Sequence, residues 1–260
     1  MVGRLHFGTA GIRGEMAAGF NRINDLVIIQ TTQGLLRYLK QVHKDLSTCS
    51  YVVGYDGRHN SERFALYVAN VLLNGGLKVY LFAQVVATPL VSYAVKKYGA
   101  VGGVMVTASH NPKKDNGYKV FWSDAAQIIN PHDMKITQAI LDELEPRPEN
   151  WDLSKVRQRE CCVDPLQDVF DSYVKDILII MPFLQYAVFR NLNEKASFKM
   201  TYSAIHGVGY YYVPKMLASF GFPEKNLVIV EEQVRGKAFW QIILCVCSAV
   251  IINGYFLFLL

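Results

Sequence analysis

Short apolar runs alternate with amphipathic segments along the first 145 residues, and this alternation is the clearest structural signal in the sequence. Strands are predicted where the apolar runs lie, at residues 51–56, 77–82, 101–106 and 118–122. Helices are predicted where apolar residues recur every three or four positions, in segments that begin near Asn24 or Asp25, at Ser61, at Thr88 and at Asn130. Because strands that alternate with helices form βαβ units, the pattern predicts an α/β fold with a mainly parallel sheet.

A Pro-rich break at residues 145–150 ends the first pattern. We therefore predict a first domain over residues 1–150 and a second, incomplete domain over residues 151–233. The second domain is expected to hold one βαβ unit, with its elements at 166–180 (helix), 199–204 (strand), 206–209 (turn), 210–220 (helix) and 227–230 (strand).

The last part of the chain has a different character, because residues 238–260 contain no Asp, Glu, Lys or Arg. Such a run is long enough to form a membrane-spanning helix, with Arg235 and Lys237 on the cytosolic side. The alternative is apolar sequence without a role of its own, and the abrupt change after Gln233 favours it. We expect residues 234–260 to be an apolar tail that is unrelated to the two domains.

Composition excludes only a few classes of function. The chain has 260 residues, of which 51% are hydrophobic, which is enough for a sizeable core. Its net charge is +5 and its basic residues are scattered, which argues against nucleic-acid binding and suits small anionic substrates. The five cysteines are odd in number and lack metal-ligand spacing, so we expect reduced thiols in a cytoplasmic protein.

The loop over residues 107–117 contains several side chains of types that commonly take part in catalysis. It contains Ser109, His110 and two lysines, directly after a predicted strand. Open α/β sheets bind ligands beyond the carboxyl ends of their strands, and a hydroxyl there becomes a nucleophile when a base or a charge assists it. On composition alone, a polar surface turn is the more common explanation of such a loop.

Two motifs make the sequence recognisable. Thr107-Ala-Ser-His-Asn-Pro112, followed by Asp115-Asn-Gly-Tyr-Lys119, resembles the phosphoserine loop of the α-D-phosphohexomutases, the family of phosphoglucomutases and phosphomannomutases. Phe7-Gly-Thr-Ala-Gly-Ile-Arg-Gly14 resembles the first active-site loop of the same family. Further segments, among them His206-Gly-Val-Gly209, resemble its animal branch that includes phosphopentomutase and glucose 1,6-bisphosphate synthase. The resemblance, from about residue 5 to about residue 233, implies a three-layer α/β/α first domain and an incomplete second domain of the same kind.

The resemblance implies a role for each matching residue. Ser109 would carry a phosphate, give it to a sugar phosphate, and recover the other phosphate of the bisphosphate that forms. Lys119 would assist proton transfer and Arg13 would face the phosphoserine, as the fixed fork of an arginine and the movable charge of a lysine allow. The catalytic set is then Ser109, Lys119, Arg13 and His110, with Thr107 and Asn111 binding the phosphate. Without the resemblance, the same lysine, arginine and histidine are typical of an edge strand and of solvated turns.

The turn His206–Gly209 lies between a predicted strand and a predicted helix, where backbone N–H groups can meet an anion. We interpret it first as a structural turn and second as a ligand loop, in which His206 and Gly207 bind substrate phosphate. It lacks the third glycine of a dinucleotide-binding fingerprint, which argues against a dinucleotide-dependent enzyme.

The resemblance therefore implies a phosphosugar mutase, an isomerase of carbohydrate metabolism. It would act on glucose 1-phosphate or ribose 1-phosphate, with a sugar 1,6-bisphosphate as activator. Family members hold Mg²⁺ with the phosphoserine and an Asp-x-Asp-x-Asp loop, a pattern that this sequence lacks. Here the phosphate on Ser109 would be the only metal ligand, and we expect Mg²⁺ to bind poorly. We expect a truncated, weakly active or inactive form. The alternative is a non-catalytic interaction or membrane-anchored protein derived from a mutase domain.

Overall fold

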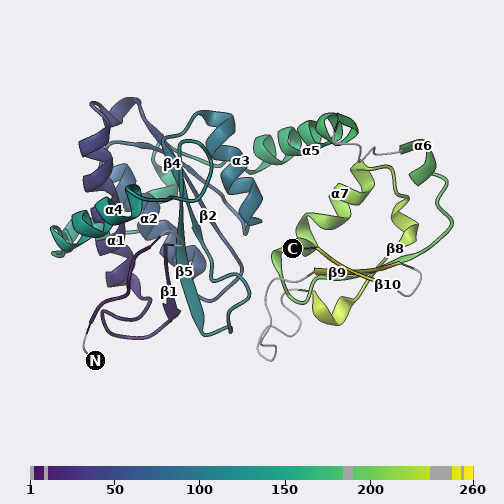
Figure 1. The fold of residues 1–260 in the computed structure, drawn as a ribbon, viewed down its shortest axis with the longest axis horizontal. Helices are drawn as coiled ribbons and strands as arrows, with labels where there is room; N and C mark the ends of the chain where they lie inside the picture. The colour runs from purple at the N-terminus through teal and green to yellow at the C-terminus, as the bar shows by residue number, and fades with distance from the viewer. Residues whose placement is uncertain (1–2, 9–10, 184–189, 235–247, 253–254, 260) are drawn as a thin grey trace. The chain divides into compact units, whose positions relative to one another are not determined.

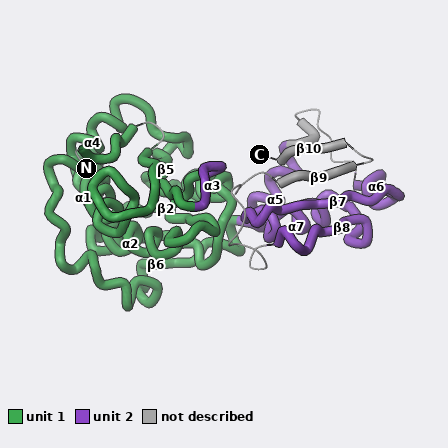
Figure 2. Tube along the Cα trace, turned by 90° about the horizontal axis from the view of Figure 1, so that it is seen from below, with its two compact units in different colours: residues 1–108, 114–169 green, residues 109–113, 170–260 purple. Residues whose placement is uncertain are grey.

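The chain divides into two compact units (Figure 2). The computed structural model describes residues 3–8, 11–183, 190–234, 248–252 and 255–259. Unit 1 contains residues 1–108 and 114–169, and unit 2 contains residues 109–113 and 170–260. The main division therefore follows Val169 rather than the Pro-rich break at residues 145–150.

Unit 1 is built on a six-stranded mixed sheet. Its strands lie in the order β1 (Ile12–Glu15), β5 (Asp115–Trp122), β4 (Gly102–Val106), β2 (Ser50–Tyr55), β3 (Lys78–Leu81) and β6 (Cys162–Val163). The pairs that join β4, β2, β3 and β6 are parallel, whereas β5 is antiparallel to both of its neighbours. The predicted α/β fold with a mainly parallel sheet is thus confirmed.

Helices cover both faces of this sheet. They are α1 (Asp25–Val42), α2 (Ser61–Asn74), α3 (Thr88–Tyr98) and α4 (His132–Leu141). Helices α1, α2 and α4 lie on one side and α3 lies on the other (Figure 1), which gives three layers. Helix α1 begins as predicted, because the Asn24 side chain caps it by accepting a hydrogen bond from the N–H of Val27 at 3.0 Å. Gly34 lets α4 approach α1 closely, since a Cβ at this position would lie 2.5 Å from the Cα of Ile140.

The segment after the Pro-rich break is held to unit 1 by buried amide side chains. The side-chain oxygen of Gln33 accepts hydrogen bonds from the N–H of Arg147 at 2.9 Å and from the side chain of Asn150 at 2.8 Å. The side-chain amide of Asn70 donates to the carbonyl of Asn150 and to that of Asp152, each at 3.1 Å. These contacts explain why the first unit extends beyond residue 150.

Unit 2 contains the single predicted βαβ unit. Strand β7 (Met200–Ser203), helix α7 (Val213–Ser219) and strand β8 (Leu227–Ile229) follow one another, and the two strands pair in parallel. Their core is formed by Met200, Tyr202 and Ala204. Two further helices, α5 (Leu166–Phe183), which begins in unit 1, and α6 (Arg190–Asn193), precede it.

The described parts of the apolar tail are strands. Strand β9 (Ser248–Ile252) pairs antiparallel with β7 and with β10 (Tyr255–Leu259), so the sheet order is β10-β9-β7-β8. A helix over 238–260 is therefore wrong for these ten positions, while residues 238–247, 253–254 and 260 lie outside the described residues. Among the helices that the structure describes, none combines the length and the apolar character needed to cross a membrane.

Candidate active site

Two cationic residues expected at the site lie on neighbouring strands of unit 1. Arg13 of β1 is paired with Gly117 of β5, and Lys119 lies two residues further along β5. Because side chains alternate between the two faces of a sheet, Arg13 and Lys119 lie on the same face, diagonally across the strand pair. Both side chains are partly exposed. The structure therefore brings the expected arginine and lysine together.

Gly11 permits the close approach of the first loop to β5. Its φ is +74°, in the left-handed region, and a Cβ here would lie 1.8 Å from the carbonyl oxygen of Tyr118. Only glycine combines this conformation with this contact. The preceding motif positions, Thr9 and Ala10, lie outside the described residues.

The amine of Lys119 has an altered protonation equilibrium. Burial lowers its pKa, the positive charge of Arg13 lowers it further, and the negative charge of Asp56 opposes both effects. A lysine in this environment releases its proton at a lower pH than an exposed lysine does. This property suits a side chain that moves a proton during group transfer.

Asp56 anchors the base of the loop that carries Ser109. Its carboxylate accepts a hydrogen bond from the Thr107 hydroxyl at 2.7 Å and one from the Ser61 hydroxyl at 2.6 Å. It also accepts from the backbone N–H of Arg58 at 3.0 Å and forms an ion pair with the Arg58 Nε at 3.2 Å. All four residues are buried. Thr107, expected to touch phosphate, therefore directs its hydroxyl proton to Asp56.

The same network reaches β5. The Arg58 guanidinium donates to the carbonyl of Asp115 at 3.1 Å. The buried side chain of Asn116 donates to the Ser61 hydroxyl at 2.9 Å and to the carbonyl of His59 at 3.1 Å. Strands β2, β4 and β5 are thereby joined by polar contacts at the end from which the Ser109 loop leaves the sheet.

Ser109 occupies an unusual backbone conformation. Its φ is +53°, a left-handed value that costs a residue with a Cβ about 1–2 kcal/mol. Such conformations cluster at functional sites, where the surrounding structure maintains them. Ser109, His110 and Asn111 follow the Thr107 network directly in the chain but group with unit 2 (Figure 2), which also contains His206 and Gly207.

The turn at His206 has a buried imidazole. His206 is 5% exposed, its φ is +61°, and neither ring nitrogen has a hydrogen-bond partner among the described residues. Its backbone N–H donates to the carbonyl of Gln233, and the N–H of Gly207 donates to the carbonyl of Ala204, each at 2.8 Å. Phosphate binding by this turn stays a prediction. Because both backbone N–H groups already have partners, the imidazole of His206 is the group that could donate a hydrogen bond to a phosphate.

The expected Mg²⁺ finds no ready set of ligands. Within the described parts of the chain, no three or more His, Cys, Asp or Glu side chains gather in a way that could hold a metal ion. The Asp56 carboxylate is already occupied by Thr107, Ser61 and Arg58. Mg²⁺ binding therefore stays a prediction.

The buried network of Asp56, Arg58, Ser61 and Asn116 was absent from the sequence-based prediction. A signal was present, because Asp56 is the last residue of one predicted parallel strand and Thr107 directly follows another, which is its neighbour in the sheet. The carboxyl ends of neighbouring parallel strands meet at one edge, so the two side chains could have been expected to lie close together. Sequence alone did not show that strands β2 and β4 are neighbours.

The fold is that of the α/β/α domain found in phosphosugar mutases. The family model described as phosphoglucomutase/phosphomannomutase, alpha/beta/alpha domain I, matches residues 4–147. This chain belongs to the phosphoglucomutase/phosphomannomutase family.

Curated relatives agree with this assignment. The chain is 44% identical over 236 residues to glucose 1,6-bisphosphate synthase of Homo sapiens, a match that covers 88% of this chain and 37% of the relative. It is 41% identical over 223 residues to phosphopentomutase of Mus musculus, covering 84% and 35% of the two chains. It is also 41% identical over 218 residues to phosphoribomutase of Saccharomyces cerevisiae, covering 80% and 34%. The chain thus spans about a third of the length of these relatives.

Solved structures show the same fold at low sequence identity. A phosphoglucomutase/phosphomannomutase family protein from Burkholderia thailandensis has a TM-score of 0.61 and 18% identity, with 91% of this chain and 46% of that chain covered. The phosphoglucomutase pp63/parafusin from Paramecium, in its open form, has a TM-score of 0.62 and 17% identity, with 92% and 46% covered. At these identities, the likeness concerns the fold alone.

Proposed function

We propose that this chain carries the phosphate-donor half of a phosphosugar mutase, with Ser109 as the residue that is phosphorylated. The observation that carries this proposal is the pair Arg13 and Lys119 on one face of the sheet, with Lys119 within electrostatic reach of Asp56. Asp56 in turn holds Thr107, two residues before the serine. Phosphoryl transfer depends on positioning and on stabilising negative charge, which a guanidinium and an amine supply.

In the proposed step, the bond between phosphorus and the Ser109 oxygen breaks while phosphorus bonds to a hydroxyl oxygen of the sugar phosphate. The sugar hydroxyl loses one proton and the serine oxygen gains one, so the step is neutral in protons. Lys119 delivers the proton to Ser109, because its lowered pKa favours release. The reverse sequence returns the other phosphate of the bisphosphate to Ser109. Arg13 and His110 stabilise the phosphate in transfer.

The proposed substrates are glucose 1-phosphate and ribose 1-phosphate, with glucose 1,6-bisphosphate as the activator. They follow from the names of the relatives, which are a glucose 1,6-bisphosphate synthase, a phosphopentomutase and a phosphoribomutase. We place the reaction in the cytoplasm as part of the same proposal. This placement follows from the odd number and scattered spacing of the cysteines.

The direct test is phosphorylation of the purified chain by glucose 1,6-bisphosphate, followed by intact-mass and peptide-mass spectrometry. One phosphate is expected on Ser109, and none on the Ser109→Ala variant. Arg13→Met and Lys119→Met should each slow the reaction by about 100-fold or more. Ser123→Ala serves as a control that removes another hydroxyl. Phosphate that enters the Ser109→Ala protein at the same rate would refute the proposal.

Complete turnover is a separate question. A coupled assay that converts glucose 1-phosphate to glucose 6-phosphate, with Mg²⁺ and the bisphosphate present, measures it. The expectation of a weak or inactive form predicts little or no turnover even where Ser109 accepts phosphate. Turnover that vanishes in Ser109→Ala would instead show that this chain is a complete mutase.

A further inference from the structure

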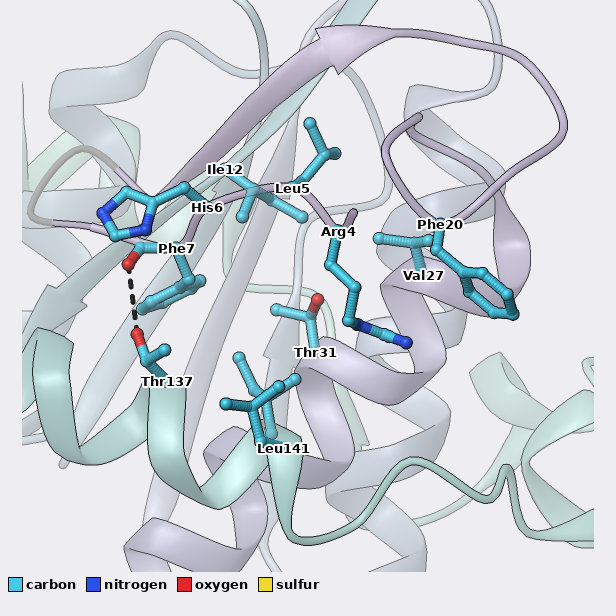
Figure 3. Close-up of a pocket in the computed structure, with 11 residues that line it drawn as sticks. Arg4, Leu5, His6, Phe7, Ile12, Phe20, Val27, Thr31, Thr137 and Leu141 are labelled. Atoms are coloured by element: carbon cyan, nitrogen blue, oxygen red, sulfur yellow. Dashed lines mark hydrogen bonds between the residues drawn. The ribbon is translucent and has the colours of Figure 1, made fainter. Parts of the chain in front are cut away.

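A cavity of about 180 Å³ lies in unit 1, between the first loop, the start of α1 and the end of α4 (Figure 3). The hydroxyl of Thr137 on α4 donates to the carbonyl of Phe7 at 3.1 Å and closes one end of it. A little more than half of the wall is apolar and includes Leu5, Phe7, Phe20, Val27 and Leu141. Its polar groups come from Arg4, His6, Thr31 and Thr137. Ile12 also lines the cavity, and its neighbour Arg13 points to the opposite face of β1. The cavity is therefore separate from the candidate active site.

One cation lies in this apolar wall. The Arg4 guanidinium donates a hydrogen bond to the side-chain oxygen of Gln30 and lies 5.1 Å from the ring centre of Phe20. The cavity lining contains no Asp or Glu, and no described carboxylate forms an ion pair with Arg4. Burial lowers the pKa of this guanidinium. A partly desolvated cation without a counter-charge is costly, and an anion placed beside it would offset that cost.

The geometry of Arg4 suits a carboxylate. An arginine has five N–H donors in a planar fork, of which the Gln30 oxygen takes one. Gln30 is itself held in place, because its amide donates to the carbonyl of Leu144. Its position therefore fixes one side of the guanidinium, and Arg4 is one of the residues that line the cavity. A carboxylate is recognised by two parallel hydrogen bonds from such a fork.

The size and polarity of the cavity restrict the rest of the ligand. An engineered apolar cavity of about 150 Å³ in another protein accommodates benzene, so 180 Å³ allows a body of about one ring. A sugar phosphate does not fit this description, since its hydroxyls would lose their hydrogen bonds against Leu5, Val27 and Leu141. An apolar body with a single negative group matches both the wall and the cation.

We propose that this cavity binds a small carboxylate with an apolar body, such as an aromatic acid or a short-chain aliphatic acid. The carboxylate pairs with Arg4, and the body fills the space bordered by Phe20, Val27 and Leu141. The site is independent of the proposed reaction at Ser109.

Fluorine NMR of 4-fluorobenzoate with the purified full chain tests this site. The ligand signal should broaden with a dissociation constant below about 1 mM, and unlabelled benzoate should reverse the broadening. Benzyl alcohol, which lacks the charge, should compete at least tenfold more weakly. Arg4→Met should weaken binding about tenfold or more, and Leu141→Trp should block it by filling the rim of the cavity. Arg37→Met removes another arginine, outside the cavity, and should bind like the unaltered chain.

Absence of broadening, equal competition by benzyl alcohol, or equal binding by Arg4→Met would each overturn the proposal. A dissociation constant that changes with protein concentration would indicate that a second copy of the chain forms the site, and would also count against the proposal. Circular dichroism establishes that each variant is folded. If Arg4→Met fails to fold, Arg4→Lys decides the question, because it keeps the charge, loses the fork and should bind several-fold more weakly.

Discussion

Asp56 is the residue on which the buried polar groups of the candidate site depend most. Its two carboxylate oxygens serve two hydroxyls, one backbone N–H and the guanidinium of Arg58. A buried charge is tolerated only when partners satisfy it, and the Asp56 and Arg58 side chains are only 5% and 1% exposed. Removing one partner therefore leaves the other charge buried and unpaired.

Asp56→Ala is expected to lower the free energy of unfolding of unit 1 by about 3–5 kcal/mol, the usual cost of breaking a buried ion pair. Urea unfolding followed by circular dichroism measures this change. Glu62→Ala, which removes the partner of Arg157 in a pair whose Glu62 side chain is 58% exposed, should cost no more than about 1 kcal/mol. Equal effects of the two substitutions would contradict the role given to Asp56.

Lys119 makes a pH-dependent contribution to stability. The pKa of Lys119 is lowered in the folded protein, so its amine binds a proton more tightly in the unfolded chain. At any pH at which Lys119 is charged, this difference lowers the stability of the folded state. The penalty is present at neutral pH and disappears as the pH rises toward the ordinary lysine value. Lys119→Met should therefore raise the melting temperature by a few degrees at pH 7, and the gain should shrink at higher pH. A gain that is constant with pH, or equal in the exposed-site control Lys40→Met, would be inconsistent with this account.

At the scale of single residues, the sequence identified the residues of the two motifs but not the residues that support them. Ser109, Arg13 and Lys119 stand out because motif resemblance acts on local strings of residues. Asp56 and Asn116 act through contacts with residues more than 50 positions away, which no local pattern encodes. The left-handed conformation of Ser109 was equally hidden, because serine has no marked preference for it.

At the scale of elements, the loop before α1 is fixed by one side chain. Asn24 caps the helix through its oxygen, and its amide donates to the carbonyls of Ala17 and Gly19, each at 2.9 Å. The loop between β1 and α1 is thereby tied to the start of the helix. This attachment contributes to the position of β1, which carries Arg13.

Asn24→Ala is expected to destabilise unit 1 by about 1–2 kcal/mol, because the cap and both loop contacts are lost. Asn24→Asp keeps the capping oxygen and loses only the two donated bonds, so its effect should be smaller. Chemical unfolding of both variants distinguishes the contributions. If aspartate proved as harmful as alanine, the cap would not be the main contribution of this side chain.

The elements themselves were largely predictable, and their exact extents were not. Apolar runs located β2, β3 and β4 within two residues, because strands buried on both faces read as continuous apolar segments. Strand β5 begins at Asp115, three positions before its predicted start, because its first residues pair with β1. The polar residues Asp115 and Asn116 gave no sign of that pairing.

At the scale of the whole molecule, the tail shows that the less favoured of two sequence-based alternatives, a membrane-spanning helix, is wrong for the described positions. A charge-free run suggested a helix, yet the described parts pair as strands β9 and β10. The run Val250-Ile-Ile252 is β-branched, and Asn253-Gly254 is the dipeptide most typical of a two-residue hairpin. The sequence-based prediction did not use these local signals.

Deletion of residues 235–260 should expose one edge of β7, which β9 covers in the intact chain. Hydrogen exchange followed by mass spectrometry is expected to show loss of protection at Met200–Ser203. Protection at Ser50–Tyr55 should not change, because that strand belongs to unit 1. Unchanged protection of β7 would mean that β9 contributes nothing to the stability of unit 2.

The central claim is that Ser109 donates phosphate to a sugar phosphate. The most direct measurement starts from the chain labelled with ³²P at Ser109 and follows the label after glucose 1-phosphate is added. We predict that the label appears in glucose 1,6-bisphosphate, and that Lys119→Met slows this transfer about 100-fold or more. Label that remains on the protein, or that is released only as inorganic phosphate, would contradict the claim.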